Sequence, residues 1–231
     1  MKQNNYNARV AWTKYLKNIA MTYPSEYVLR IFKGVYPKLN FDKSKLRDKK
    51  ILDISCGDGR NLSVLKECGF KVYATEITPE IIEKVKANLT KRKLKKITLK
   101  EGSNDKLPFN DSFFDFLLSW NACYYMGKNT DFQKHIKEYA RLLKPDGYLV
   151  LSIPKKTCFI YQGSKEFKKG YILVQNDPFN LRNGEILRIF HSEKEIKKEF
   201  SQYFNRFIFA SVHDDCFGLN YHWHLVICQK K

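Results

Sequence analysis

The stretch DISCGDG, residues 53–59, joins an acidic residue to two glycines directly after a short apolar run. Glycine lacks a side chain, so Gly57 and Gly59 let the backbone turn tightly and come close to a ligand. A helix that follows such a loop offers free backbone N–H groups to an anionic group. The stretch therefore predicts a loop that binds a ligand through its backbone.

A second acidic residue, Glu76, ends the next apolar segment. Its two carboxylate oxygens can accept hydrogen bonds from both hydroxyls of a ribose. The dinucleotide fingerprint GxGxxG requires a third glycine, but Leu62 stands at that position. The sequence therefore excludes the dinucleotide fingerprint, and a glycine loop alone does not identify the ligand.

Apolar runs alternate with helical periodicity through the middle of the chain, where Pro79 stands at the favoured first position of a helix. The patterns predict strands over 50–55, 72–77, 97–101, 113–120 and 148–153, and helices over 61–68, 79–89 and 132–143. This alternation predicts a parallel sheet with helices on both faces. Ligands bind at the carboxyl ends of such strands, where the glycine loop and Glu76 lie.

The two ends of the chain follow other patterns. Residues 6–36 favour helix with a break near Tyr23-Pro24, after which Ser25 could cap a second helix. The segment 155–190 holds many aromatic and turn residues without clear periodicity. Ser192 and Glu195 form a capping box for a helix to about Phe204, and strands over 207–212 and 221–228 predict an antiparallel hairpin.

The composition of the 231 residues limits the class of protein. An excess of basic residues gives a net charge of +18, which favours anionic partners, although a solvated lysine-rich surface explains it equally well. The six cysteines have no CxxC spacing, which fits a reducing compartment. The polar N-terminus and the lack of a long apolar run predict a cytoplasmic protein without membrane association. The sequence does not define the oligomeric state.

Four spaced segments together resemble the class I S-adenosylmethionine-dependent methyltransferases, from about Ile51 to Pro154. ILDISCGDGRN is similar to the first motif of that family, and VYATEIT to the strand that ends in a ribose-binding acid. GSNDKLPFNDSFFDFLLS resembles the adenine loop and fourth strand, and ARLLKPDGYLVLSIP the fifth strand with its preceding turn. The resemblance implies an α/β fold with a Rossmann-like, doubly wound seven-stranded sheet, mostly parallel with an antiparallel C-terminal hairpin.

The resemblance also implies S-adenosyl-L-methionine as the cofactor and assigns residues to it. Asp53 would order the first loop, Glu76 would bind the ribose, and Ile77 would lie under the adenine. The full set of implied cofactor-binding residues is Asp53, Ser55, Gly57, Gly59, Asn61, Glu76, Ile77, Asn104, Asp105, Trp120 and Asn121. Of these, the pair 104–105 would meet the adenine edge and the pair 120–121 would flank the sulfonium.

Two positions depart from the family pattern. Ser55 replaces the usual first glycine, and Ser103 replaces a frequent aspartate. If Ser55 holds a negative φ, its backbone can still approach the methionine part and its hydroxyl can bind it. We therefore expect the loop to bind the cofactor.

Methyl transfer from a sulfonium is an in-line displacement, so the protein mainly aligns the acceptor. A base is needed only if the nucleophile must lose a proton. Tyr125 and His191 are the candidate catalytic residues, with packing and a surface position beside a helix cap as their respective alternatives. The charge and the aromatic segment predict a small anionic acceptor that bears a phosphate or carboxylate and is methylated on oxygen or nitrogen, with Lys155, Lys156 and Arg182 as candidate anion-binding residues.

Other functions remain open at this stage. The positive charge also fits a methyltransferase of tRNA or rRNA, although the chain has no room for an appended RNA-binding module. A non-catalytic cofactor-binding protein is a further alternative. His213, His222 and His224 could gather near Asp214, but alternating histidines on an edge strand are usually exposed, and we expect no metal.

We expect a single methyltransferase domain over residues 1–231. Within it, residues 1–48 would form a helical cap, 49–154 the cofactor-binding core, 155–190 an acceptor or lid insertion, and 191–231 the last helix and hairpin.

Overall fold

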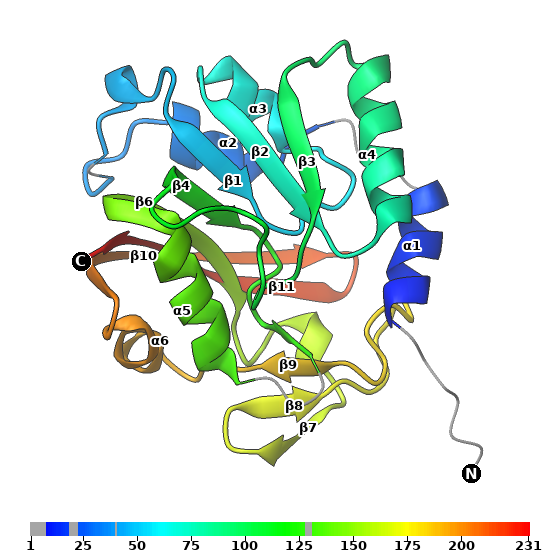
Figure 1. The fold of residues 1–231 in the computed structure, drawn as a ribbon. Helices are drawn as coiled ribbons and strands as arrows, with labels where there is room; N and C mark the ends of the chain where they lie inside the picture. Colours follow the sequence, from blue (N-terminus) through cyan, green and yellow to red (C-terminus); the bar gives the residue numbers. More distant parts are fainter. Residues whose placement is uncertain (1–7, 19–22, 40, 128–130) are drawn as a thin grey trace.

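A seven-stranded sheet forms the centre of the computed structural model, which describes residues 8–18, 23–39, 41–127 and 131–231 (Figure 1). Its strands run in the order β10-β11-β6-β4-β1-β2-β3. The five strands β6, β4, β1, β2 and β3 are parallel to one another. The pairs β10–β11 and β11–β6 are antiparallel. The strands are β1 (Lys50–Asp53), β2 (Lys71–Glu76), β3 (Ile97–Glu101), β4 (Phe114–Ser119), β6 (Leu143–Pro154), β10 (Phe204–Cys216) and β11 (Leu219–Lys230). This topology confirms the predicted fold class.

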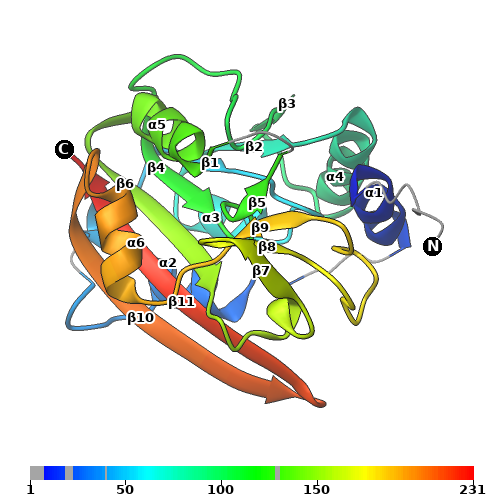
Figure 2. The same ribbon diagram turned by 90° about the horizontal axis from the view of Figure 1, so that it is seen from below.

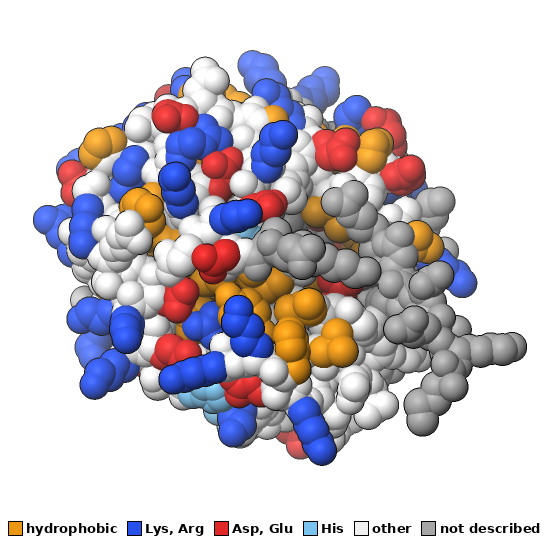
Figure 3. Space-filling view, turned by 60° about the horizontal axis from the view of Figure 1, so that its bottom comes forward, with side chains coloured by type: hydrophobic (Ala, Val, Ile, Leu, Met, Phe, Trp, Pro, Cys, Tyr) orange, Lys and Arg blue, Asp and Glu red, His pale blue; other side chains and the backbone are white. Residues whose placement is uncertain are grey.

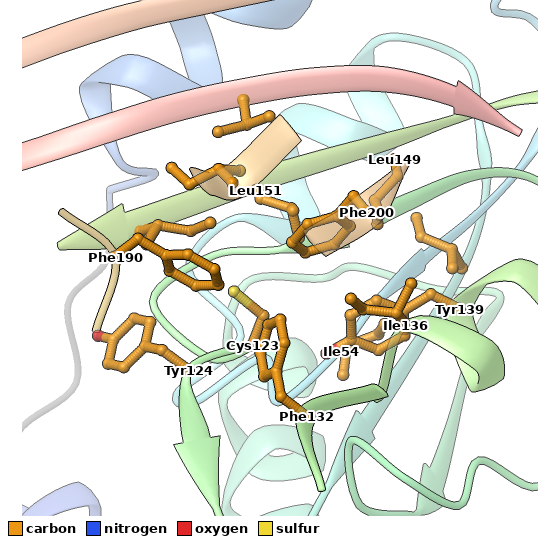
Figure 4. Packing of buried hydrophobic residues seen from close by; sticks show 14 of the residues in the cluster. Ile54, Cys123, Tyr124, Phe132, Ile136, Tyr139, Leu149, Leu151, Phe190 and Phe200 are labelled. Carbon is orange, nitrogen blue, oxygen red and sulfur yellow. The ribbon is translucent and has the colours of Figure 1, made fainter. Parts of the chain in front are cut away.

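Helices cover both faces of the sheet because its strands are apolar on both sides. Phe116 and Val150 face one hydrophobic core with α2 (Glu26–Lys33), α3 (Leu62–Glu67) and α4 (Pro79–Lys91). Leu117 and Leu149 face the opposite core with α5 (Phe132–Leu142) and α6 (Glu193–Phe200). Figure 4 shows the second core around Cys123. The resulting three layers position the carboxyl ends of the strands at one edge.

Local signals start the helices where the sequence predicts. Thr78 caps α4 by accepting a hydrogen bond from the Ile81 N–H, with Pro79 in the first turn. Ser192 caps α6 in the same way by accepting from the Glu195 N–H. Ser25 stands at the start of α2, but its side chain makes no cap bond.

The chain ends differ from the predictions in length. The predicted 6–36 helical stretch is α1 (Ala8–Asn18) and α2, with residues 19–22 outside the described part. The capped helix α6 ends at Phe200, four residues before the predicted Phe204. The hairpin is confirmed but its strands are much longer than predicted, because Phe217 and Gly218, with φ of 53° and 82°, turn the chain within two residues.

A second, four-stranded sheet was not predicted. It has the order β5-β9-β8-β7 and consists of β5 (Tyr125–Met126), β7 (Lys165–Lys168), β8 (Tyr171–Leu173) and β9 (Ile186–Arg188). Strands of two to four residues are too short to show a reliable alternation. Figures 1 and 2 show this sheet below the carboxyl ends of β1 and β2, so the segment 155–190 lies against the expected ligand-binding edge.

The surface carries the basic excess. Figure 3 shows Lys and Arg side chains dispersed over one face of the molecule, with acidic side chains among them. Within the described residues, no helix is long and apolar enough to cross a membrane.

Phe70 connects α2 to the sheet and should contribute strongly to stability. Its ring is 1% exposed and packs edge-on against Phe32 and Phe116, with centroid distances of 5.6 and 5.2 Å. We predict that Phe70→Ala lowers the free energy of unfolding by about 3–5 kcal/mol, because it leaves a cavity in the core. Phe167→Ala, at a position 58% exposed, is the control and should change it by less than about 0.5 kcal/mol. Denaturant unfolding of both variants tests the pair, and equal effects would contradict the prediction.

Candidate cofactor and acceptor site

A cavity of about 1310 Å³ opens at the carboxyl ends of β1, β2 and β4. The predicted cofactor-binding residues that line it are Asp53, Ser55, Gly57, Asn61, Glu76, Ile77, Asn104, Asp105, Trp120 and Asn121. Gly59 does not line the cavity. Its φ is +78°, and a side chain there would meet Val85 of α4 at 3.0 Å, so it shapes the loop and packs against the helix.

Glu76 joins the first loop to the end of β2. One carboxylate oxygen accepts a hydrogen bond from the Gly57 N–H at 2.6 Å, and the other accepts from the Ile77 N–H at 3.0 Å. The residue is only 5% exposed. Burial raises the pKa of Glu76 to about 7, although the two N–H donors oppose the shift. Each oxygen keeps a lone pair that can accept from a ribose hydroxyl.

Asp53 adds a second buried acid beside Glu76. Its exposed fraction is 1%, and within the described part of the chain its Oδ2 has no hydrogen-bond partner. Burial, with a further contribution from Glu76, raises the pKa of Asp53 well above its ordinary value. A buried acceptor without a partner is costly, so this oxygen fits a donor group such as the amino group of the cofactor's methionine part.

Ser55 has a φ of +54°, so the condition of a negative φ for the approach of its backbone to the methionine part is not met. The backbone takes the left-handed conformation that glycine adopts easily and that serine adopts at a cost. The loop thus keeps the glycine-type turn with a serine in it. The Ser55 side chain lines the cavity.

The loop after β3 begins beside Glu76, because the Gly102 N–H donates to the Glu76 carbonyl at 2.9 Å. Asn104 uses its side chain internally: its Nδ2 donates to the Ala122 carbonyl, and its Oδ1 accepts from the Tyr139 hydroxyl. Asp105 Oδ1 accepts a hydrogen bond from the Ser103 hydroxyl. The second Asp105 oxygen is therefore the better candidate to meet a ligand.

The end of β4 is held by a reciprocal pair. The Asn121 N–H donates to the Ser152 hydroxyl oxygen, and that hydroxyl donates to Asn121 Oδ1, both at 2.7 Å. Asn121 has a φ of +57°, which asparagine tolerates better than most residues. This arrangement fixes Trp120 and Asn121 at the rim of the cavity.

The far end of the cavity is aromatic and contains Tyr125. The Tyr125 hydroxyl accepts a hydrogen bond from Arg182 Nε at 2.9 Å, and Arg182 Nη1 donates to Asp177 at the same distance. The Arg182 guanidinium also lies over the Trp12 ring, 5.3 Å from its centroid. Burial raises the pKa of Tyr125 and Arg182 opposes the rise, so the phenol is neutral near pH 7.

His191 is not among the described residues that line the cavity, so the structure gives no support for its predicted position near the acceptor. Its Nε2 is 3.3 Å from Glu166 Oε2, and its backbone N–H donates to Glu195. The capping box of α6 fixes it there. Lys155 also points elsewhere and donates to Ser211, and neither it nor Lys156 lines the cavity.

Several residues of the cavity were not predicted as site residues. Trp12 and Tyr15 come from α1, His135 from α5, and Trp223 from β11. The only available signal was aromatic composition: all three tryptophans of the sequence line the cavity. No periodicity could show that these distant elements meet.

The histidines of the hairpin take a different arrangement. His213 and His222 stack across β10 and β11 with centroids 4.5 Å apart. In the described ranges, no three His, Cys, Asp or Glu side chains are placed to hold a metal ion.

Comparisons with known proteins agree with this geometry. Residues 52–151 match the family model described as a methyltransferase domain. A ubiquinone/menaquinone biosynthesis C-methyltransferase of Zymomonas mobilis is 30% identical over 139 residues, which span 60% of this chain and 54% of the relative. An uncharacterized methyltransferase of Bacillus subtilis is 25% identical over 104 residues, or 45% and 40% of the two chains. The chain thus spans only about half the length of the curated relatives it matches, or less.

Solved structures share the fold over most of the chain. A Methanosarcina mazei S-adenosylmethionine-dependent methyltransferase superimposes with a TM-score of 0.64 and 24% identity, covering 85% of this chain and 98% of that one. A Pyrococcus horikoshii protein superimposes with a TM-score of 0.66 and 18% identity, covering 94% of this chain and 99% of that one. These neighbours share the fold of the chain, and the description of the Methanosarcina mazei protein names S-adenosylmethionine as the compound on which that protein depends.

The raised pKa of Glu76 predicts that cofactor affinity depends on pH. Ribose hydroxyls donate to the ionised carboxylate, so binding must displace the proton that Glu76 holds below about pH 7. We expect affinity for S-adenosylmethionine to fall as pH drops from 8 to 6 and to level off above 7. Glu76→Gln should weaken binding at pH 8 by about 1–3 kcal/mol and make the pH dependence shallower. Calorimetric titration checks both, and a parallel pH dependence in the variant would refute the role of Glu76.

The left-handed backbone of Ser55 predicts opposite effects for two substitutions. Ser55→Gly removes the strain of a Cβ at positive φ and should change the free energy of unfolding by between zero and about +1 kcal/mol. Ser55→Val should lower it by about 1–2 kcal/mol, because a β-branched side chain is least compatible with this conformation. Thermal and denaturant unfolding measure the difference. Equal stability of the two variants would show that the turn does not require a positive φ.

Proposed function

We propose that this chain, whose residues 52–151 form a class I S-adenosylmethionine-dependent methyltransferase domain, transfers a methyl group to oxygen or nitrogen of a small acceptor. The observation that carries the proposal is one continuous cavity of about 1310 Å³ with an acidic nucleoside end and an aromatic end. A pocket for one drug-sized ligand has roughly 300–1,000 Å³, so this cavity has room for a cofactor and a small second molecule.

The residues at the nucleoside end would hold the cofactor. Asp53 would accept from its amino group, Glu76 from its ribose hydroxyls, and Ile77 would present an apolar surface to its base. The bound cofactor supplies an electrophilic methyl group. Trp120 and Asn121 would then separate the two ends of the cavity and align the acceptor beside that group.

The aromatic end favours a small, flat acceptor. Its walls include Trp12, Tyr124, Tyr125, Phe159 and Trp223, which can stack on a ring. The name of the Zymomonas mobilis relative refers to quinone biosynthesis, and a ring-bearing acceptor agrees with that. We therefore propose an acceptor with a ring and a polar group that meets the Tyr125 hydroxyl.

The anionic character predicted from the net charge receives limited support. No lysine is among the described residues that line the cavity. Arg60 and Arg182 do line it. Arg60 lies at the nucleoside end and interacts with Asp53. At the aromatic end, Asp177 neutralises part of the charge of Arg182. Arg182 can still attract one carboxylate or phenolate, so we propose an acceptor with at most a single negative group at this end.

RNA is the weaker alternative, because the acids Asp53, Asp58, Glu76, Asp105 and Glu185 line the same cavity. The acids of this cavity repel a phosphate backbone. A non-catalytic role would leave cofactor binding without turnover.

A turnover screen tests the proposal. The chain is incubated with S-adenosylmethionine and hydroxylated aromatic acids, catechols, quinols, small amines or phosphorylated metabolites, with tRNA and rRNA as polymers. We expect release of S-adenosylhomocysteine with one ring-bearing class, and none from Glu76→Ala. Turnover of RNA alone, or cofactor binding without any turnover, would overturn the proposal.

Tyr125 should act at the acceptor end and not in cofactor binding. We predict that Tyr125→Phe keeps S-adenosylmethionine affinity within about twofold but lowers acceptor turnover at least tenfold, because it removes the hydroxyl that Arg182 orients. Tyr124→Phe is the matched control, since the adjacent ring is buried and stacked on Tyr125. Titration calorimetry and steady-state kinetics separate the two effects. An equal loss in both variants would indicate packing instead of a role for the hydroxyl.

A further inference from the structure

His135 presents a hydrogen-bond acceptor to the nucleoside end of the cavity. The residue lies on α5, is 2% exposed and lines the cavity. Its Nδ1 is 3.1 Å from the Cys123 carbonyl oxygen. A carbonyl can only accept, so Nδ1 carries the hydrogen, and in the neutral ring Nε2 keeps its lone pair. The described residues provide no hydrogen-bond partner for Nε2.

The place of His135 in the cavity follows from its neighbours. One helical turn further along α5, the Tyr139 hydroxyl donates to Asn104 in the loop after β3. That loop starts beside Glu76, through the bond from the Gly102 N–H. Burial lowers the pKa of His135, with Cys123, Asp105 and Asp131 acting in the opposite direction. The ring is therefore neutral near pH 7, and its interaction with Asp105 puts it at the same end of the cavity as the loop after β3.

The other acceptors at this end are mostly occupied. Asn104 Oδ1 accepts from Tyr139, and one Asp105 oxygen accepts from Ser103. The second Asp105 oxygen and His135 Nε2 remain to face a ligand. Two acceptors at the base-binding end match an exocyclic amino group, which donates two hydrogens.

We propose that His135 Nε2 accepts a hydrogen bond from the 6-amino group of the cofactor's adenine and so selects adenine over a 6-oxopurine. This inference rests on the proposed function, because it requires a nucleoside cofactor in the cavity. A 6-oxo group would place its lone pairs against those of Nε2 and Asp105. The site then rejects the oxo analogue because its acceptors are left without donors.

Binding of two product analogues tests the inference without knowledge of the methyl acceptor. S-adenosyl-L-homocysteine and S-inosyl-L-homocysteine, its deaminated form, are titrated by calorimetry against the intact chain. We expect the adenosyl compound to bind at least about tenfold more tightly. His135→Leu should lose this preference to within about threefold. His135→Gln should keep adenosyl affinity and gain inosyl affinity, because an amide both accepts and donates.

His213→Leu is the matched control, since that histidine lies on the hairpin and does not line the cavity. It should keep the wild-type preference, and thermal unfolding of each variant verifies that the chain is folded. An unchanged preference in both His135 variants would overturn the inference and leave the proposed function intact. No binding of S-adenosyl-L-homocysteine to the wild-type chain would overturn both.

Discussion

The hydrogen bonds of the Glu76 carboxylate determine the shape of the cavity. One oxygen holds the Gly57 N–H of the first loop and the other holds the Ile77 N–H that starts the second loop. These bonds fix two strand ends relative to each other without closing the space between them. Burial disfavours the negative charge of both Glu76 and Asp53 and raises the pKa of each, and the charge of Glu76 raises the pKa of Asp53 further. A ligand that donates hydrogen bonds to both acids stabilises these charges, so the free site is arranged to favour such a ligand.

The main sheet was predictable because its signals are local and long. Buried apolar runs mark β1, β2 and β4, and local signals mark the starts of two helices, Pro79 for α4 and the Ser192 cap for α6. The small sheet was not predictable, since Tyr125–Met126 and Ile186–Arg188 pair only through tertiary structure. The length of the final hairpin depended on a two-residue turn, Phe217-Gly218, whose first residue is not a usual turn residue.

The two halves of the site also differ in how well the sequence predicts their residues. The residues of the cofactor half come at or directly after the ends of β1, β2, β3 and β4 in the sequence, so the motifs at those positions predict most of them. The acceptor half comes from α1, the small sheet and β11, which meet only in the folded chain. His191 was a candidate by its place before a helix, but it is not among the described residues that line the cavity. Ser55 shows a further limit: its residue type favours a negative φ, whereas its φ in the loop is positive.

Net charge was the least informative signal about the acceptor. A charge of +18 describes the whole chain, and on the face that Figure 3 shows the Lys and Arg side chains are dispersed. The electrostatic field of this charge raises the local concentration of anions around the molecule, but it does not determine which molecule binds in the cavity. The lining determines what enters. Among the described residues it contains five acids, no lysine and two arginines, Arg60 in the first loop and Arg182 at the aromatic end, where it is paired with Asp177. The acids of the lining therefore repel an anion that the surface attracts, unless its single charge can bind Arg182. The field and the lining together favour a weakly charged ring over a polyanion.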